Sequence, residues 1–526
     1  MLVVAFAATA LYRFLPLTGF SNDHHVYLAG AQQILHGDWP TRDWVDPGMP
    51  LMFVASAAAQ VAIGRSQYAE ALLVVTAYGA ASCALVLAGR RLSGSLAIGA
   101  LAALAAVLIF PRTYAYPKIL LYAVAPLSWA WYLRRPGTPA AAAVAAWVAI
   151  AGLFRHDHGA FLAAAGFLAV AFTPARGAGE IARRCAVFAL LVTLMLAPYA
   201  LFVAANGGVG RYLAMGVEFS AAESERSRFV PPILSLAGPV QVNADAFLYL
   251  AYRALPPVAA LALAVRWLGQ GRPPETPLVV ALVAAAALVN SFFLRDPLRV
   301  RLPDAIVPNV LLAAWLAGRA VAVRRPVPRA AALTAVVALA VAGLGAVTVV
   351  GEVREQVNRG GLATGLEHVP AYVSRRTREL RSRFSDRQVP HPHVTPLVPF
   401  FRYVDRCTPP TAHLLVAGFA PELFVYARRP FAAGMTSFVP GYHGSPAAQQ
   451  AMVARMTRQA VPFTVAYSDA YQDWQSAFPL VADHVRARFV PMTEIPTSPE
   501  RRLQVFVDAA LEPAGRDPQT GWPCFR

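Results

Sequence analysis

Long apolar stretches alternate with short polar segments from the first residue to about residue 350. A transmembrane helix needs about 20 consecutive apolar residues, with a tolerated range of roughly 17–25. By this measure we predict about eleven membrane spans, several of them at the short end of the range. They lie near residues 1–18, 68–89, 94–110, 119–133, 139–154, 159–173, 185–204, 247–266, 276–294, 305–321 and 330–350.

Basic residues gather in every second loop between these stretches. The clusters are Arg90/Arg91, Arg134/Arg135, Arg176/Arg183/Arg184, Arg266/Arg272 and Arg319/Arg324/Arg325/Arg329. Cytoplasmic loops carry the excess of Lys and Arg in membrane proteins. A single orientation, with the N-terminus inside, explains all five clusters. The alternate loops and the region after residue 350 are therefore predicted to face outside.

The first outer loop, residues 19–67, is predicted to contain two helices that do not cross the membrane. Residues 50–63 are apolar but too short to span comfortably, so we expect a re-entrant or interfacial helix there. Tyr27–His36 has apolar residues at helical spacing and is predicted to form the second such helix.

The pattern changes after residue 350. Residues 351–399 are rich in Arg and then in Pro, which favours a segment along the membrane surface followed by a linker. In 400–526 we predict a small α/β domain. Its strands are expected at 413–419, 463–467 and 504–507, and its helices at 421–428 and 446–459. The predicted fold is a polytopic α-helical membrane protein, with a transmembrane module over 1–350 and a C-terminal extracytoplasmic α/β domain.

Composition agrees with this fold class. The chain is 57% hydrophobic and only 14% charged, whereas a soluble domain is about 25% charged. The net charge of +17 follows the loops and lacks basic-aromatic stretches, which argues against nucleic-acid binding. Cys407 and Cys524 lie in the polar C-terminal region and would form a disulfide in an oxidising compartment; the alternative is two free thiols.

The first outer loop also holds the first acidic residue, Asp23, directly after the first apolar stretch. A carboxylate at that place is costly near lipid and is a candidate functional group. The alternative is that Asp23 and its neighbours only end a helix and hydrate a loop. The loop reads SNDHHVYLAGAQQILHGDWPTRDWVDPGMPL.

This order of residues resembles the first loop of the GT-C superfamily, the multi-span glycosyltransferases that use polyprenyl-phosphate-linked sugars, such as protein O-mannosyltransferases and the lipid A aminoarabinose transferase. The residues that follow the family order are Asp23, Tyr27, Gly37, Asp38, Pro40, Arg42, Asp43, Asp46, Pro47, Pro50 and Leu51. The resemblance implies that Asp23 is the catalytic base that deprotonates the acceptor. His24, His25, Tyr27, Asp43 and Asp46 are candidates for contact with the acceptor or for support of the base, and the His pair could tune the pKa of Asp23 or bind a metal. Many relatives have Asp-Glu where this chain has Asp-His.

A second polar group, Arg155 to His158, lies between two predicted spans on the outer side. The resemblance implies that Arg155 binds the phosphate of the donor, with Asp157 supporting it. His156 and His158, together with Asp23 and His24, are candidate ligands for a divalent cation, Mg or Mn. The alternative is a polar turn between two short helices.

Further outer cations precede two later spans. Arg295, Arg299 and Arg301 run against the positive-inside rule, so an anionic donor phosphate is a candidate partner. Lys118 is a candidate for the same role. The alternatives are an Arg–Asp network closed through Asp296 and Asp304, and interfacial anchoring around Lys118.

The leading functional hypothesis is therefore a GT-C glycosyltransferase. It would move a sugar from a polyprenyl-phosphate donor to a hydroxyl of a glycan, glycolipid or protein of the cell envelope. A transporter or flippase for a lipid-linked saccharide is the second hypothesis, and a scaffold displaying the C-terminal domain is the third. The high Ala, Arg and Pro content is typical of a GC-rich bacterial genome, which predicts a bacterial inner membrane with periplasmic outer loops.

Overall fold

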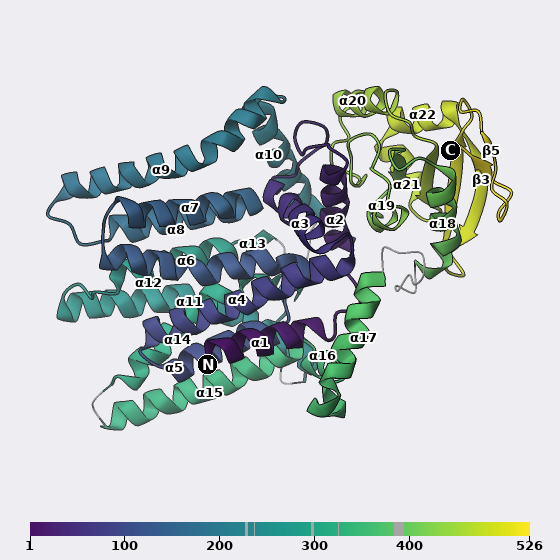
Figure 1. Cartoon of the computed structure of the whole chain (residues 1–526). Coiled ribbons are helices and arrows are strands. Elements are labelled where there is room, and N and C mark those ends of the chain that lie inside the picture. The colour runs from purple at the N-terminus through teal and green to yellow at the C-terminus, as the bar shows by residue number, and fades with distance from the viewer. Residues whose placement is uncertain (21, 227–229, 236, 296–298, 324–325, 383–393) are drawn as a thin grey trace. The chain divides into compact units, whose positions relative to one another are not determined.

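The structure is a computed structural model that describes residues 1–526 apart from 21, 227–229, 236, 296–298, 324–325 and 383–393 (Figure 1). The chain divides into two compact units, each assembled from separate stretches. The helical unit comprises Met1–Pro16, Val74–Ala200 and Ser224–Val373. The mixed unit comprises Leu17–Leu73, Leu201–Glu223 and Ser374–Arg526. The first outer loop thus belongs to the same unit as the C-terminal region.

Apolar helices that lie side by side make up the helical unit (Figure 1). Its helices are α1 (Leu2–Phe14), α4 (Gln67–Ser93, which starts in the mixed unit), α5 (Leu96–Leu108), α6 (Tyr116–Arg134), α7 (Thr138–Phe154), α8 (His156–Ala171), α9 (Ala178–Ala205), α11 (Val240–Gln270), α12 (Thr276–Asn290), α13 (Phe292–Arg295), α14 (Ile306–Val321), α15 (Pro326–Val350) and α16 (Val353–Arg359). Short 3-10 turns connect them: η1 (Thr113–Ala115), η2 (Arg299–Arg301), η3 (Pro303–Ala305), η4 (Leu362–Thr364) and η5 (Leu366–His368).

Several of these helices can cross a membrane. In the described part of the chain, 5 are long and apolar enough: Gln67–Ser93, Ala178–Ala205, Val240–Gln270, Arg299–Val321 and Ala330–Val350. Other predicted spans correspond to shorter apolar helices, including α1, α5, α7 and α12. The protein is therefore a multi-pass membrane protein, while the count of about eleven spans stays a prediction.

Small residues allow the helices α4, α5 and α14 to approach closely. A Cβ on Gly99 would lie 2.5 Å from the carbonyl oxygen of Val86, and one on Gly318 would lie 2.5 Å from the Cα of Ser93. Backbones at such distances exclude any side chain. Close packing of this kind holds helices together in lipid, where burial of apolar surface provides no driving force between them.

The mixed unit combines helices with two sheets. Its helices are α2 (Asn22–Leu35), α3 (Pro50–Ile63), most of α10 (Val209–Arg226), α17 (Val369–Ser382, which starts in the helical unit), α18 (Val398–Cys407), α19 (Glu422–Ala427), α20 (Pro446–Met456), α21 (Tyr471–Ala477) and α22 (Pro479–Arg488), with the 3-10 turn η6 (Thr395–Leu397). The two helices predicted in the first outer loop are confirmed as α2 and α3. Pro50 occupies the first turn of α3, where its missing N–H leaves no hydrogen bond unmade.

The main sheet has the strand order β1-β2-β4-β3. Its strands are β1 (Leu414–Ala417), β2 (Phe463–Tyr467), β3 (Phe489–Pro496) and β4 (Arg502–Asp508), and β5 (Gly515–Arg516) pairs with β6 (Pro523–Cys524) in a second sheet. β1 and β2 are parallel and buried throughout, as strands covered on both faces are. β4 pairs antiparallel with β2 and with β3. The three predicted strands are present, whereas β3 was not predicted.

The segment from α18 to β6 is called the α/β part of the mixed unit. Hydrogen bonds join the first outer loop to this α/β part. The side-chain amide of Gln32 donates to the carbonyl oxygens of Phe424 (3.2 Å) and Arg429 (2.9 Å). The buried Gln33 accepts from the backbone N–H of Phe431 at 3.0 Å. Because α2 carries Asp23, the α/β part helps to set the orientation of the predicted base.

Cys407, at the end of α18, is bonded to Cys524 in β6 across 117 residues of sequence. We expect Cys407→Ser to lower the thermal unfolding midpoint of the full chain in detergent by several degrees. A bridge over so long a loop restricts the unfolded state and contributes about 2–5 kcal/mol. Reductant should lower the wild-type midpoint by the same amount and leave the variant unchanged. Equal midpoints for wild type and variant would contradict this prediction.

Candidate functional site

Asp23 lies in the first turn of α2, exposed at the surface of the mixed unit. A carboxylate in this turn interacts favourably with the positive end of the helix dipole. α2 itself packs tightly on α3: a Cβ on Gly30 would lie 2.3 Å from the ring of Phe53. The helix that carries the predicted base is therefore held rigidly, while the carboxylate is accessible to a substrate.

His24, next to Asp23, belongs to a buried polar network. Its Nε2 lies 2.7 Å from Oε1 of Glu70, and the Ser56 hydroxyl donates to the same oxygen at 2.9 Å. All three residues are fully buried. The network joins α2, α3 and the first turn of α4 just beneath Asp23. Sequence reasoning missed Glu70, although an isolated acid at the start of a long apolar helix is a signal that could have found it.

We expect Glu70→Ala to destabilise the protein by about 2–4 kcal/mol, because it leaves the His24 ring and the Ser56 hydroxyl without their partner in a dry interior. The thermal unfolding midpoint of the purified full chain measures this loss. Glu494→Ala, at a half-exposed carboxylate of β3, is the matched control and should change the midpoint little. An unchanged midpoint in Glu70→Ala would show that the network does not hold α2.

The carboxylates of the segment after α2 shape the loop. Asp43 accepts from the backbone N–H of Trp39 (2.8 Å) and from Nε of Arg42 (2.7 Å). Asp46 is buried and accepts from the N–H groups of Gly48 and Met49 and from the Tyr212 hydroxyl, at 2.8–2.9 Å. Both predicted acceptor residues thus hold the turn, and Asp46 also ties it to α10.

His25 and Tyr27 are buried residues of α2. The His25 ring lies 5.8 Å from the ring of Tyr426, and the Tyr27 hydroxyl donates to the sulfur of Met49 at 3.6 Å. These contacts place both residues in the packing around Asp23. Their predicted part in acceptor binding stays a prediction.

In the helical unit, Arg155 is the single residue between α7 and α8, with an extended backbone at φ −170° and ψ 121°. The two helices cross closely below it, since a Cβ on Gly159 would lie 2.3 Å from Cα of Gly152. The guanidinium of Arg155 donates to both oxygens of Asp157 at 2.9 and 3.0 Å. The sharp turn therefore presents an Arg–Asp pair at the end of a helix hairpin.

Lys118, at the start of α6, is close enough to Arg155 and Asp157 for their charges to act on its ammonium group. Its ammonium pairs with Asp304 of η3. His158 is buried, and its Nδ1 lies 2.8 Å from the Tyr122 hydroxyl. The structure thus brings together Lys118, Arg155, Asp157 and His158, which the sequence had placed in two separate motifs.

The third predicted cationic group is only partly described. Arg299 pairs with Asp245 at 3.3 Å and approaches Glu352 at 3.8 Å, and Arg301 is half-buried in η2. The side chain of Arg295 and residues 296–298 lie outside the described residues. The alternative of a network closed through Asp296 lies outside the described residues, and Asp304 pairs with Lys118.

A divalent-cation site is the least supported of the predicted sites. His156 is exposed, while His24 is engaged by Glu70 and His158 by Tyr122. Among the described residues, the group of three potential ligands whose atoms lie within 4.8 Å consists of Cys407, Asp517 and Cys524. The two cysteines there are bonded to each other, so this group is not a metal site.

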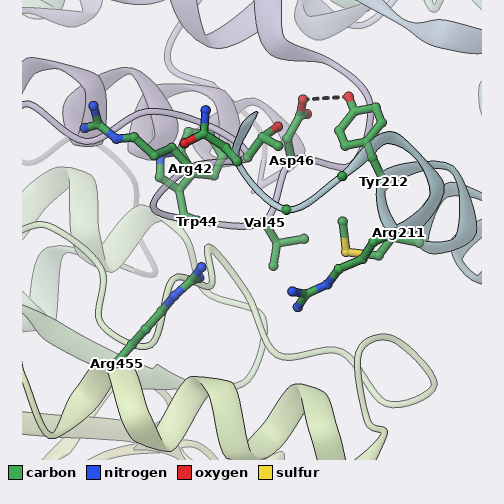
Figure 2. Close-up of a pocket in the computed structure, with 12 residues that line it drawn as sticks. Arg42, Trp44, Val45, Asp46, Arg211, Tyr212 and Arg455 are labelled. Carbon is green, nitrogen blue, oxygen red and sulfur yellow. Dashed lines mark hydrogen bonds between the residues drawn. The ribbon is translucent and has the colours of Figure 1, made fainter. Parts of the chain in front are cut away.

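The loop 41–46, α10 and α20 enclose a pocket of about 260 Å³ inside the mixed unit (Figure 2). Its lining residues are Thr41, Arg42, Trp44, Val45, Asp46, Asn206, Gly207, Gly208, Arg211, Tyr212, Met215 and Arg455. The backbone N–H of Val45 donates to the carbonyl oxygen of Gly434 at 3.1 Å, which holds the loop against the α/β part.

The whole chain is similar to a solved membrane protein. It matches the crystal structure of ArnT from Cupriavidus metallidurans bound to undecaprenyl phosphate with a TM-score of 0.55 and 14% identity, over 97% of this chain and 98% of that one. The chain has the ArnT fold. The apo form of the same ArnT matches with a TM-score of 0.49 and 15% identity, over 96% and 97% of the two chains.

The GT-C resemblance of the first outer loop is confirmed by this likeness at the level of the fold. No protein-family profile matches the chain. No curated protein matches it either.

Proposed function

We propose that the protein is a GT-C glycosyltransferase that moves a sugar from a polyprenyl-phosphate donor to a hydroxyl group on the outer face of a bacterial inner membrane. The observation that carries the proposal is an exposed carboxylate, Asp23, in a chain with the ArnT fold. The resemblance of the first outer loop to the GT-C superfamily assigns the role of base to this residue. The ArnT structure was solved with undecaprenyl phosphate bound, which supports a lipid phosphate as the leaving group.

The reaction needs only two kinds of group from the protein. The acceptor oxygen forms a bond to the anomeric carbon while the bond from that carbon to the phosphate oxygen breaks. Asp23 takes the proton of the acceptor hydroxyl as general base. Cations stabilise the negative charge that develops on the departing lipid phosphate. We assign this role to Arg155 and Lys118, with Asp157 and Asp304 holding them in place.

The remaining cations and the C-terminal region have supporting roles in this proposal. Arg295, Arg299 and Arg301 remain candidates for contact with the donor phosphate. The α/β part of the mixed unit lies in the periplasm, where the Cys407–Cys524 bond is stable. Its hydrogen bonds to α2 orient the helix that bears Asp23.

Binding of undecaprenyl phosphate by the purified full chain tests the proposal first. We expect saturable binding in detergent, and transfer of radiolabelled sugar from a polyprenyl-phosphate donor to an envelope extract. Binding with transfer supports the enzyme. Binding with movement of the intact lipid-linked sugar across a liposome membrane, without transfer, would instead establish a flippase, and absence of binding would remove the donor altogether.

A further inference from the structure

The pocket between loop 41–46, α10 and α20 is rich in positive charge. Its lining residues include Arg42, Arg211 and Arg455, against a single carboxylate, Asp46. In Figure 2 the guanidinium groups of Arg211 and Arg455 reach from different helices toward the space beside Val45. Two cations that approach one cavity from separate elements require an explanation, since their repulsion disfavours the folded state.

Neither Asp46 nor Asp43 forms an ion pair with Arg211 or Arg455. Asp46 accepts hydrogen bonds from two backbone N–H groups and the Tyr212 hydroxyl, and Asp43 forms an ion pair with Arg42 at 2.6 Å. Among the residues that the structure describes, no carboxylate lies within ion-pair distance of Arg211 or Arg455. Both cations therefore keep their hydrogen-bond donors available to a ligand.

Burial makes this arrangement costly at Arg455. Its side chain is half-buried, and burial lowers its pKa; Asp43 raises that pKa in part, while Arg211 and Arg458 lower it further. An oxyanion in the pocket would offset both the burial and the repulsion. Guanidinium groups bind phosphate and carboxylate oxygens through paired N–H donors, and such charge-assisted hydrogen bonds are the strong ones.

We propose that this pocket binds an oxyanion carried by the acceptor, held between Arg211 and Arg455. The inference rests on the proposed transferase function and adds an acceptor class to it: a molecule with a phosphate or carboxylate group at a distance from its reacting hydroxyl. Gly207 and Gly208 line the pocket with φ values of +125° and +89°, so the backbone there presents no side chain to the ligand.

Inorganic phosphate is the probe that tests the site. We would titrate it calorimetrically into the full chain in phosphatidylcholine nanodiscs, at constant ionic strength set with chloride. The variants are Arg211→Gln and Arg455→Gln. The matched control is Arg458→Gln, which removes the same charge from an exposed position that does not line the pocket.

We expect one phosphate site in wild type, weakened about tenfold in each pocket variant, because each loses a charge-assisted hydrogen bond. Arg458→Gln should bind nearly as wild type does. Undecaprenyl phosphate should bind equally to wild type and to both pocket variants. If those variants lose undecaprenyl phosphate as well, the pocket belongs to the donor and the acceptor assignment is overturned.

Two other results would also overturn the inference: no phosphate binding by wild type, or equal losses in all three variants. If a pocket variant does not fold, the wild type still decides the matter. Phosphate should protect Arg211 and Arg455, but not Arg458, from modification by phenylglyoxal, and equal modification of all three would reject the site. Failure of the proposed transferase function can be distinguished from failure of this inference, because the phosphate measurements use no lipid donor.

Discussion

Asp23→Asn is expected to reduce sugar transfer by about 10²–10⁴-fold while leaving the affinity for undecaprenyl phosphate unchanged. A positioned general base contributes a factor of that size, and asparagine keeps the shape of the side chain but cannot accept the proton. Because Asp23 is exposed at the first turn of α2, the substitution places no new polar group in the interior. The measurement is the rate of transfer from a polyprenyl-phosphate donor, with lipid binding measured in parallel.

The matched control is Asp483→Asn, which removes one carboxylate from an exposed position of α22, where it pairs with Arg486. It should transfer sugar at the wild-type rate. A scaffold or a flippase would be indifferent to Asp23→Asn. Wild-type transfer by Asp23→Asn would therefore remove this residue from the mechanism, and loss of lipid binding would mean that it holds the donor instead.

Arg155→Ala is expected to weaken binding of undecaprenyl phosphate by about 10–100-fold. Hydrogen bonds to charged groups contribute about 1.5–3 kcal/mol, and each 1.4 kcal/mol corresponds to a factor of ten. The substitution also removes the guanidinium partner of Asp157. The negative charge of this carboxylate would then repel the lipid phosphate at the place where it is expected to bind. The measurement is the equilibrium affinity of the purified protein for the lipid.

Two further variants sharpen that test. Arg155→Lys keeps the charge but loses the planar fork, so its affinity should lie between those of wild type and Arg155→Ala. Arg134→Ala, at the opposite end of α6 from Lys118, removes a cation from a predicted cytoplasmic loop and should bind the lipid normally. Equal affinities for all these proteins would exclude Arg155 from the phosphate site.

The outer-loop helices and the main sheet show which secondary-structure elements the residue pattern predicts and which it does not. The apolar run at 50–63 forms α3 with the predicted bounds, because helix formation depends on neighbouring residues and on a proline at the first position. β3 escaped prediction because Pro491 and Glu494 interrupt its apolar pattern. That strand exists through its pairing with β4, a contact that no local pattern records.

The candidate site was predictable in its residue types but only partly in its roles. Asp23, Arg155 and Lys118 could be selected because charged groups beside membrane spans are rare. The hydrogen-bond partners of the neighbouring polar residues could not be predicted. Glu70 reaches His24 across 46 residues, and Tyr212 reaches Asp46 across 166. The part of Asp43 and Asp46 in acceptor binding stays a prediction, and the structure adds that both residues hold the loop.

By itself, the sequence determined that this is a multi-pass membrane protein with an acidic first loop, because hydrophobic length and charge placement are properties of the chain alone. Tertiary structure alone decided that this loop, α10 and the C-terminal sheet form one unit. It also decided which charges are neutralised and which, at Arg211 and Arg455, still face a cavity. The physical reason is that hydrogen bonds and ion pairs form between residues that are neighbours only after folding.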